Sequence, residues 1–80
     1  MLSEDIKLIL TKVFHDIFND RSIVLDDAMT AKDIKEWDSL NHINLIVAIE
    51  RQFNVRFSTK EVNALKNVGG IISLIKKKIS

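Results

Sequence analysis

At residues 38–53 the chain reads DSLNHINLIVAIERQF, an apolar stretch that follows a long polar segment. Its apolar residues fall at helical spacing, which predicts an α-helix from Ser39 to about Phe53. Asp38 is a good N-cap, because its carboxylate can accept hydrogen bonds from the free backbone N–H groups of the first turn. Ser39 is then the first helical residue, with its hydroxyl at an exposed rim. Since a helix start carries partial positive charge and unpaired N–H donors, a phosphodiester built on Ser39 would be stabilised there.

The predicted helix is apolar over a wide arc, so we expect it to lie between other elements with only a narrow stripe exposed. The apolar arc contains Leu40, Ile43, Ile46, Val47, Ile49 and Phe53. The complementary strip contains Asn41, Asn44, Ala48, Arg51 and Gln52. Because this strip begins at Ser39, a partner that addresses Ser39 would also touch the strip.

A helix and a long connection are expected before this stretch. The helix is expected to have Ser3 as its cap, Glu4 and Asp5 in its first turn, and its end at Asn19-Asp20. Its apolar face consists of Ile6, Ile9, Leu10, Val13 and Ile17. Residues 19–38 form the connection, in which Met29 to Lys35 is expected to make a short helical turn. Apolar residues that pin the connection across the core are Ile23, Val24, Leu25, Met29 and Ile34.

Two more helices are expected after it. Ser58-Thr59-Lys60-Glu61 has the pattern of a capping box at the start of a short helix. Asn67 can cap a final helix, in which the Gly69-Gly70 pair allows a neighbour to approach closely. The apolar face of that helix contains Val68, Ile71, Ile72, Ile75 and Ile79. With no strand-type alternation and no proline, the sequence predicts an all-α fold, a small antiparallel four-helix bundle with a long first loop and a short third helix.

Length and composition limit the class of protein. Eighty residues, of which 46% are hydrophobic and 29% charged, predict one globular domain over residues 1–80. The absence of cysteine excludes disulfides, thiolate metal sites and catalysis through a thiol of the chain itself. The acidic N-terminus does not resemble a secretory signal, and no apolar run is long enough to span a bilayer. We therefore expect a cytoplasmic location without stable membrane insertion.

Charge is unevenly distributed along the chain. Residues 1–50 contain ten acidic and five basic residues, net −5, whereas residues 51–80 contain one acidic and seven basic residues, net +6. Such asymmetry affects the steering of partners rather than the fold. Lys76, Lys77 and Lys78 fan out around the last helix, so we interpret them as a solvated helix end that stabilises the macrodipole.

Two histidines and the single tryptophan are further candidates for functional roles. His42 follows Ser39 by three residues, and a serine paired with a histidine is found in the active sites of hydrolases. Against a hydrolase, the sequence contains no nucleophile elbow and no evident oxyanion hole. We interpret His42 as a rim residue on the partner-facing side and His15 as solvated; the two are not at metal-ligand spacing. Trp37 is expected at the edge of the core, with a gating role at a ligand cavity or partner contact as the alternative.

The sequence resembles the acyl carrier protein family over nearly its whole length. Asp38-Ser39-Leu40 leading into an apolar helix, the position of this motif, the chain length and the order of the helices carry the resemblance. It implies that Ser39 holds 4′-phosphopantetheine from coenzyme A, with Asp38 and Leu40 in the same cofactor-binding motif. The thiol of that arm would hold an acyl group as a thioester, so the chain is expected to be a carrier and not an enzyme.

The resemblance also implies partners and cargo. The expected partners are a phosphopantetheinyl transferase, an acyl- or aminoacyl-loading ligase and downstream acyltransferases or synthases, all acting on a monomer. In the family, the helix after the serine is usually rich in acids, whereas this chain has Asn41, Asn44 and Arg51 there. That departure favours a carrier for a specialised lipid or secondary metabolite over the housekeeping carrier of fatty acid biosynthesis. A short or medium acyl chain is expected in the interior between the helices, lined by Leu40, Ile43, Val47 and Ile72.

Two alternative functions are compatible with the sequence. Trp37-Asp38-Ser39 is also similar to D-alanyl carrier proteins, so an aminoacyl cargo is the alternative within the class. Outside the class, the alternative is a small helical protein- or DNA-binding module. Against DNA binding, the helix with the widest apolar arc is the one that would have to be free to enter a groove, and we expect no nucleic-acid partner.

Overall fold

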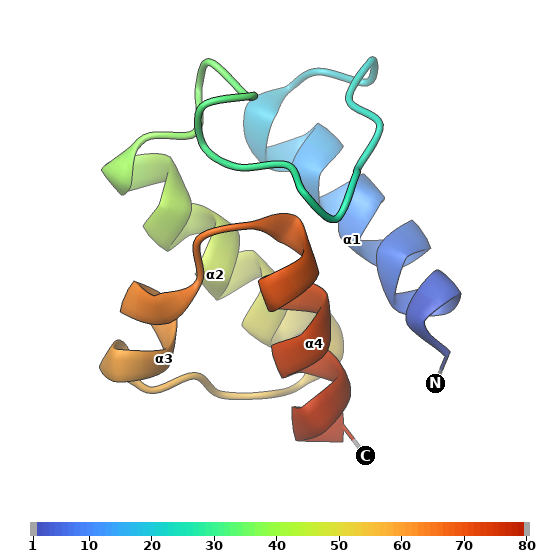
Figure 1. Cartoon of the computed structure of the whole chain (residues 1–80), viewed down its shortest axis with the longest axis vertical. Coiled ribbons are helices and arrows are strands. Elements are labelled where there is room, and N and C mark those ends of the chain that lie inside the picture. Colours follow the sequence, from blue (N-terminus) through green and yellow to red (C-terminus); the bar gives the residue numbers. More distant parts are fainter. Residues whose placement is uncertain (1, 80) are drawn as a thin grey trace.

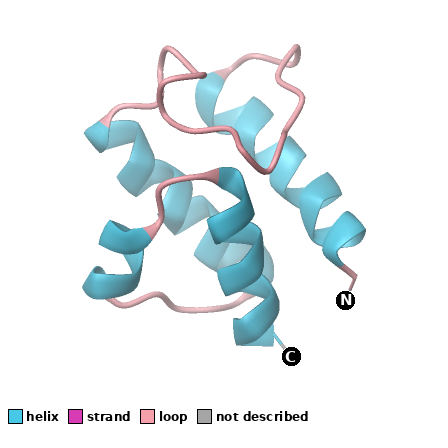
Figure 2. Cartoon of the chain, viewed as in Figure 1, coloured by secondary structure: helices cyan, strands magenta, loops and turns pink. Residues whose placement is uncertain are grey.

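Within residues 2–79, which the computed structural model describes apart from the side chain of Ser3, four α-helices surround one hydrophobic core (Figure 1). They are α1 (Ser3–Phe18), α2 (Ser39–Phe53), α3 (Thr59–Ala64) and α4 (Val68–Ile79). α1 runs in the opposite direction to α2 and α4 and packs against both (Figure 1). The longest loop joins α1 to α2 and covers one end of the helices (Figure 2). The all-α arrangement with a long first loop and a short third helix agrees with the prediction.

α1 contributes one complete face to the core. Its buried residues recur at spacings of three and four, as the helical period requires, and are Ile6, Leu10, Val13, Phe14 and Phe18. The helix ends as predicted at Asn19, which adopts the left-handed conformation with φ of 50°. The predicted cap was wrong: the helix already includes Ser3, so Leu2 occupies the N-cap position, and its hydrocarbon side chain has no atom that can accept a cap bond.

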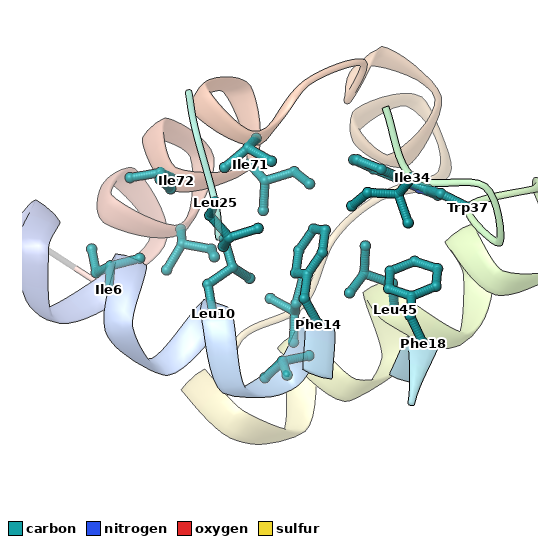
Figure 3. Close-up of a cluster of buried hydrophobic side chains, with 14 residues drawn as sticks. Ile6, Leu10, Phe14, Phe18, Leu25, Ile34, Trp37, Leu45, Ile71 and Ile72 are labelled. Carbon is teal, nitrogen blue, oxygen red and sulfur yellow. The ribbon is translucent and has the colours of Figure 1, made fainter. Parts of the chain in front are cut away.

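An aromatic cluster joins α1 to the residues just before α2 (Figure 3). Trp37 meets Phe14 edge to face with ring centroids 5.4 Å apart, and Phe18 lies 6.3 Å from the Trp37 ring. Ile34 and Leu45 pack in the same part of the core. Such aromatic pairs stabilise by about 0.5–1.5 kcal/mol beyond the area that they bury. Trp37 is only 5% exposed, which confirms its predicted place in the core.

The buried face of α2 is narrower than predicted. Leu45, Ile46 and Ile49 are buried. In contrast, three residues assigned to the apolar arc are exposed, with exposed fractions of 69% for Leu40, 57% for Ile43 and 42% for Val47. The physical reason is that α3 has only six residues and buries none of them, so it covers little of α2. The prediction of a helix with only a narrow wet stripe was therefore wrong.

The long loop is held at both the core and the start of α4. Leu25 and Ile34 are buried, but Val24 is 79% exposed and does not pin the loop as predicted. Backbone N–H groups of Val68 and Gly69 donate to the carbonyls of Met29 and Asp27, each at 2.9 Å.

Gly69 permits this close approach, since an added Cβ would lie 3.1 Å from the Asp27 carbonyl oxygen. The expected helical turn from Met29 to Lys35 is a series of turns with bonds such as Asp33 N–H to Thr30 O at 2.9 Å, and not a helix.

His15 is half-buried and was wrongly predicted to be solvated. Its Nε2 lies 2.7 Å from the carbonyl oxygen of Ile23, in the loop that follows α1. Nearby, the Ser22 hydroxyl and backbone N–H both donate to the Asp20 carboxylate, which lowers the pKa of Asp20. These bonds fold the first part of the loop back onto α1.

Both predicted caps in the C-terminal half are present. Ser58 N–H donates to Glu61 Oε1 at 2.8 Å, and Glu61 N–H donates to Ser58 Oγ at 3.1 Å, which completes the capping box of α3. Lys78 of α4 also contacts Glu61 Oε1 at 2.9 Å, so this carboxylate links the two helices. Asn67 Oδ1 accepts from Gly70 N–H at 2.7 Å at the start of α4.

Glu61 makes the stability of this region sensitive to acid. The Ser58 N–H bond and then the Lys78 ammonium hold the pKa of Glu61 below its ordinary value of 4.5. A carboxyl with a lowered folded-state pKa stabilises the protein above its unfolded-state pKa, and that contribution is lost as the pH falls through the folded-state pKa. We expect Glu61→Gln, which can still accept from Ser58 N–H, to lose less stability than the wild type below pH about 4.5. Urea unfolding from pH 7 to pH 3 measures this difference, and parallel pH profiles for the two proteins would contradict it.

Candidate functional site

The start of α2 places Ser39 at an exposed position. Asp38 has an extended backbone, and its Oδ1 accepts from the Asn41 N–H at 2.8 Å. The Asp38 carbonyl accepts from the His42 N–H at 2.8 Å, which is the first bond of the helix. Asp38 is thus the N-cap, as predicted, and Ser39 is the first residue of α2 with an exposed side chain.

The chain on both sides of Ser39 is held in place. Two residues before it, Trp37 is buried among the aromatic rings of α1. Two residues after it, the Asn41 side-chain amide donates to the Glu36 carbonyl at 2.7 Å. Because these neighbours are anchored, the backbone of Ser39 is held in place and its side chain is presented to solvent. The role of Asn41 was not predicted, because the sequence pattern marks it only as one residue of a polar strip.

The electrostatic setting of Ser39 favours a phosphate. The first turn of α2 contains no acidic residue. Apart from the carboxylate of the capping Asp38, no side chain of this turn neutralises the partial positive charge of the helix start, which therefore remains available to an added anion. Backbone N–H groups at such a terminus are donors for an anion. The start of α2 is therefore electrostatically suited to the phosphodiester predicted at Ser39.

An open groove of about 730 Å³ begins beside Ser39 and extends between the long loop, α2 and α3. Residues from all three segments and from the α3–α4 connection line it: Thr30, Ala31, Lys32, Trp37, Asp38, Ser39, His42, Ile43, Val62, Asn63, Leu65 and Lys66. Of the residues predicted to line an interior cavity, only Ile43 is among them. Leu40 and Val47 face solvent, so that part of the prediction was wrong, whereas Ile72 is buried in the core between the helices.

His42 connects the two walls of this groove. Trp37 Nε1–H donates to His42 Nδ1 at 3.1 Å, so Nδ1 is the unprotonated nitrogen. His42 Nε2–H then donates to the Val62 carbonyl of α3 at 3.3 Å. The imidazole also stacks on the Trp37 indole. His42 is therefore half-buried in the groove wall rather than at a rim.

The arrangement around Ser39 does not prepare it as a nucleophile. Trp37 and Val62 engage both ring nitrogens of His42, which leaves neither to accept a proton from Ser39. Among residues 2–79, no three His, Asp or Glu side chains are grouped so that they could hold a metal ion. What the geometry offers is an accessible hydroxyl beside a groove, which another protein can modify.

Comparison with known proteins gives two kinds of relative. The acyl carrier proteins of Rickettsia canadensis and Rickettsia rickettsii are each 29% identical over 72 residues, covering 90% of this chain and 83% of theirs. The solution structure of the holo acyl carrier protein from Geobacter metallireducens is 46% identical, with a TM-score of 0.83, over 88% of this chain and 80% of that one. This chain belongs to the acyl carrier protein family.

Membership of the acyl carrier protein family confirms the resemblance, the four-helix fold with one short helix, and the assignment of this chain as a non-catalytic carrier. A scan against models of protein families found no match. No helix within residues 2–79 combines the length and the apolarity that crossing a membrane requires.

The hydrogen bonds that join Trp37, His42 and Val62 should couple the effects of substituting Trp37 and His42 on the free energy of unfolding. We expect His42→Phe to lower the free energy of unfolding by about 1–3 kcal/mol, because it leaves the indole N–H and the Val62 carbonyl without partners. Trp37→Phe removes the donor itself, so the double variant should lose less than the sum of the two single losses. Urea unfolding followed by circular dichroism measures all three variants. Additive losses would show that the bond between the rings does not contribute.

Proposed function

We propose that Ser39 is the attachment site of a 4′-phosphopantetheine arm, transferred from coenzyme A. The observation that carries the proposal is the exposed hydroxyl at the capped start of α2, directly beside an open groove. The relative from Geobacter metallireducens is a holo acyl carrier protein, the form that bears a prosthetic group, and supports the same assignment.

The residues around Ser39 fit such a group. The hydroxyl is accessible, the helix N-terminus favours a phosphodiester anion, and the adjoining groove has both polar and apolar walls. When bound, the arm supplies a terminal thiol that holds an acyl group as a thioester. Since the chain contains no cysteine, a thiol for this chemistry has to come with the group.

The side chains of the groove have distinct tasks in this proposal. Asp38 begins the helix and presents Ser39 to the transferase, with Leu40 exposed next to it. Thr30 and Asn63 offer polar atoms to the amides of the arm, whereas Trp37, Ile43, Val62 and Leu65 offer apolar surface. The bonds of His42 hold the α2 and α3 walls together.

The partners that follow are a phosphopantetheinyl transferase, a loading ligase and downstream acyltransferases or synthases. We place this action in the cytoplasm, with residues 1–80 as one carrier domain. The exposed face of α2 is apolar and basic instead of acidic, which supports a specialised lipid or secondary-metabolite pathway over housekeeping fatty acid synthesis. The apolar part of the groove lining, formed by Trp37, Ile43, Val62 and Leu65, favours an acyl cargo over an aminoacyl one.

Measuring the intact mass of the protein tests whether Ser39 is the attachment site. With coenzyme A, Mg²⁺ and a broad-specificity phosphopantetheinyl transferase, we expect the wild type to gain the mass of one arm and Ser39→Ala to gain none. Ser73→Ala removes another exposed helical hydroxyl and is the matched control that should be modified normally. Modification of Ser39→Ala, or no modification of the wild type by several transferases, would contradict the assignment. Offering fatty acids and amino acids to candidate ligases then identifies the cargo.

A further inference from the structure

An exposed apolar row begins next to Ser39 and follows α2. Leu40, Ile43 and Val47 are separated by three and four residues, so they lie along one line of the helix surface. Their exposed fractions of 69%, 57% and 42% show that none of the other helices covers this line. Exposed apolar groups that adjoin one another mark sites of protein contact more often than single exposed residues do.

The row ends in a hollow with basic walls. Val47, the last apolar residue, lines a hollow of about 370 Å³ together with Arg51 and Arg56. Both arginines are exposed, and neither forms an ion pair with any residue in the range 2–79. The one acid in the hollow, Glu50, uses its Oε2 to accept from the Phe57 N–H at 2.8 Å. The charge that this hollow offers to a partner is therefore positive.

The apolar row and the basic hollow form one continuous surface along α2. Arg51 follows Val47 by four residues and continues the line of the apolar row. The helical rise places it about 18 Å along the axis from Ser39. Ile43 lines the groove beside Ser39, and Val47 lines the hollow, so the apolar row bridges the two.

Resting on the proposed attachment of the arm to Ser39, we propose that the enzymes acting at Ser39 carry carboxylates, in place of basic residues, around the apolar patch that contacts this face of α2. The apolar patch covers Leu40, Ile43 and Val47, and the carboxylates meet Arg51 and Arg56. An enzyme that reaches the Ser39 hydroxyl has to cover the first turns of α2, so the row lies inside its footprint. Complementary charge sets the on-rate and the choice of partner. An enzyme with a basic docking face is disfavoured by the same arginines.

The probe is one phosphopantetheinyl transferase in two forms. The first form has a basic carrier-binding face, and in the second form those basic residues are replaced by glutamate. Each form is supplied with coenzyme A and Mg²⁺, and kcat/KM for arm attachment is measured by intact mass. The carriers are the wild type, Arg51→Glu, Val47→Ser and Lys12→Glu. Lys12 is exposed on α1, outside the groove and the hollow, so Lys12→Glu is the control for the same change of charge.

We expect the wild type to be modified faster by the glutamate-bearing transferase. Arg51→Glu should reverse this preference. We expect kcat/KM to change about tenfold with each form of the transferase, and the size of this change should fall at high salt. Val47→Ser should lower kcat/KM about fivefold or more with both forms, as expected for truncation of a residue at an interface. Lys12→Glu should behave as the wild type. Circular dichroism of each carrier confirms that it is folded.

Three results would overturn the docking proposal. Arg51→Glu could leave the preference unchanged, Arg51→Glu and Lys12→Glu could act alike, or Val47→Ser could match the wild type. Binding to phosphatidylglycerol vesicles that Arg51→Glu abolishes, with unchanged transferase rates, would assign this face to a lipid surface instead. If neither form, nor any of several other transferases, modifies the wild type at Ser39, the proposed function itself fails. Modification at Ser39 at equal rates in every carrier would contradict only the docking face.

Discussion

The hydrogen bond from the Asn41 N–H to Asp38 Oδ1, at 2.8 Å, determines where α2 begins and so where Ser39 stands. A helix without a cap leaves its first N–H groups unsatisfied, and its first turn frays. Here the cap is supported from both sides, because Trp37 is fixed in the core and the Asn41 side chain bonds to the Glu36 carbonyl. One short segment therefore contains the anchor, the cap and the exposed hydroxyl. The attachment of an arm that we propose for Ser39 needs this combination, since the hydroxyl has to be accessible while its surroundings stay ordered.

The groove beside Ser39 depends on two features of the fold, the path of the long loop and the short length of α3. The long loop crosses to the start of α4, where Gly69 lets the Asp27 carbonyl approach. α3 is so short that it covers little of α2, and His42 ties it to the other wall through the Val62 carbonyl. The exposed apolar row and the open groove thus have the same structural origin.

Apart from the cap of α1, where Leu2 and not Ser3 is the N-cap, sequence reasoning succeeded where the determinants are local. The Asp38 cap, the Ser58 capping box and the Asn67 cap each depend on side chains within three residues of their partners, and all three are present. It failed where distant segments decide burial. A helical wheel shows that Leu40 is apolar but not that α3 fails to reach it, and nothing local reveals that His42 bonds to Trp37 and α3 together. The exposed position of Ser39 at a helix start was predictable from the sequence, whereas the groove beside it was not.

The cap can be measured directly by amide hydrogen exchange of the first turn of α2. In the wild type, the Asn41 N–H should be protected, because it donates to the Asp38 carboxylate. Asp38→Ala removes the acceptor at a cost of about 1 kcal/mol, so exchange at Asn41 should speed up about fivefold, with the effect confined to the first turn. A wild-type Asn41 amide that exchanges as fast as one in an open loop, or an Asp38→Ala variant with unchanged exchange, would contradict the account.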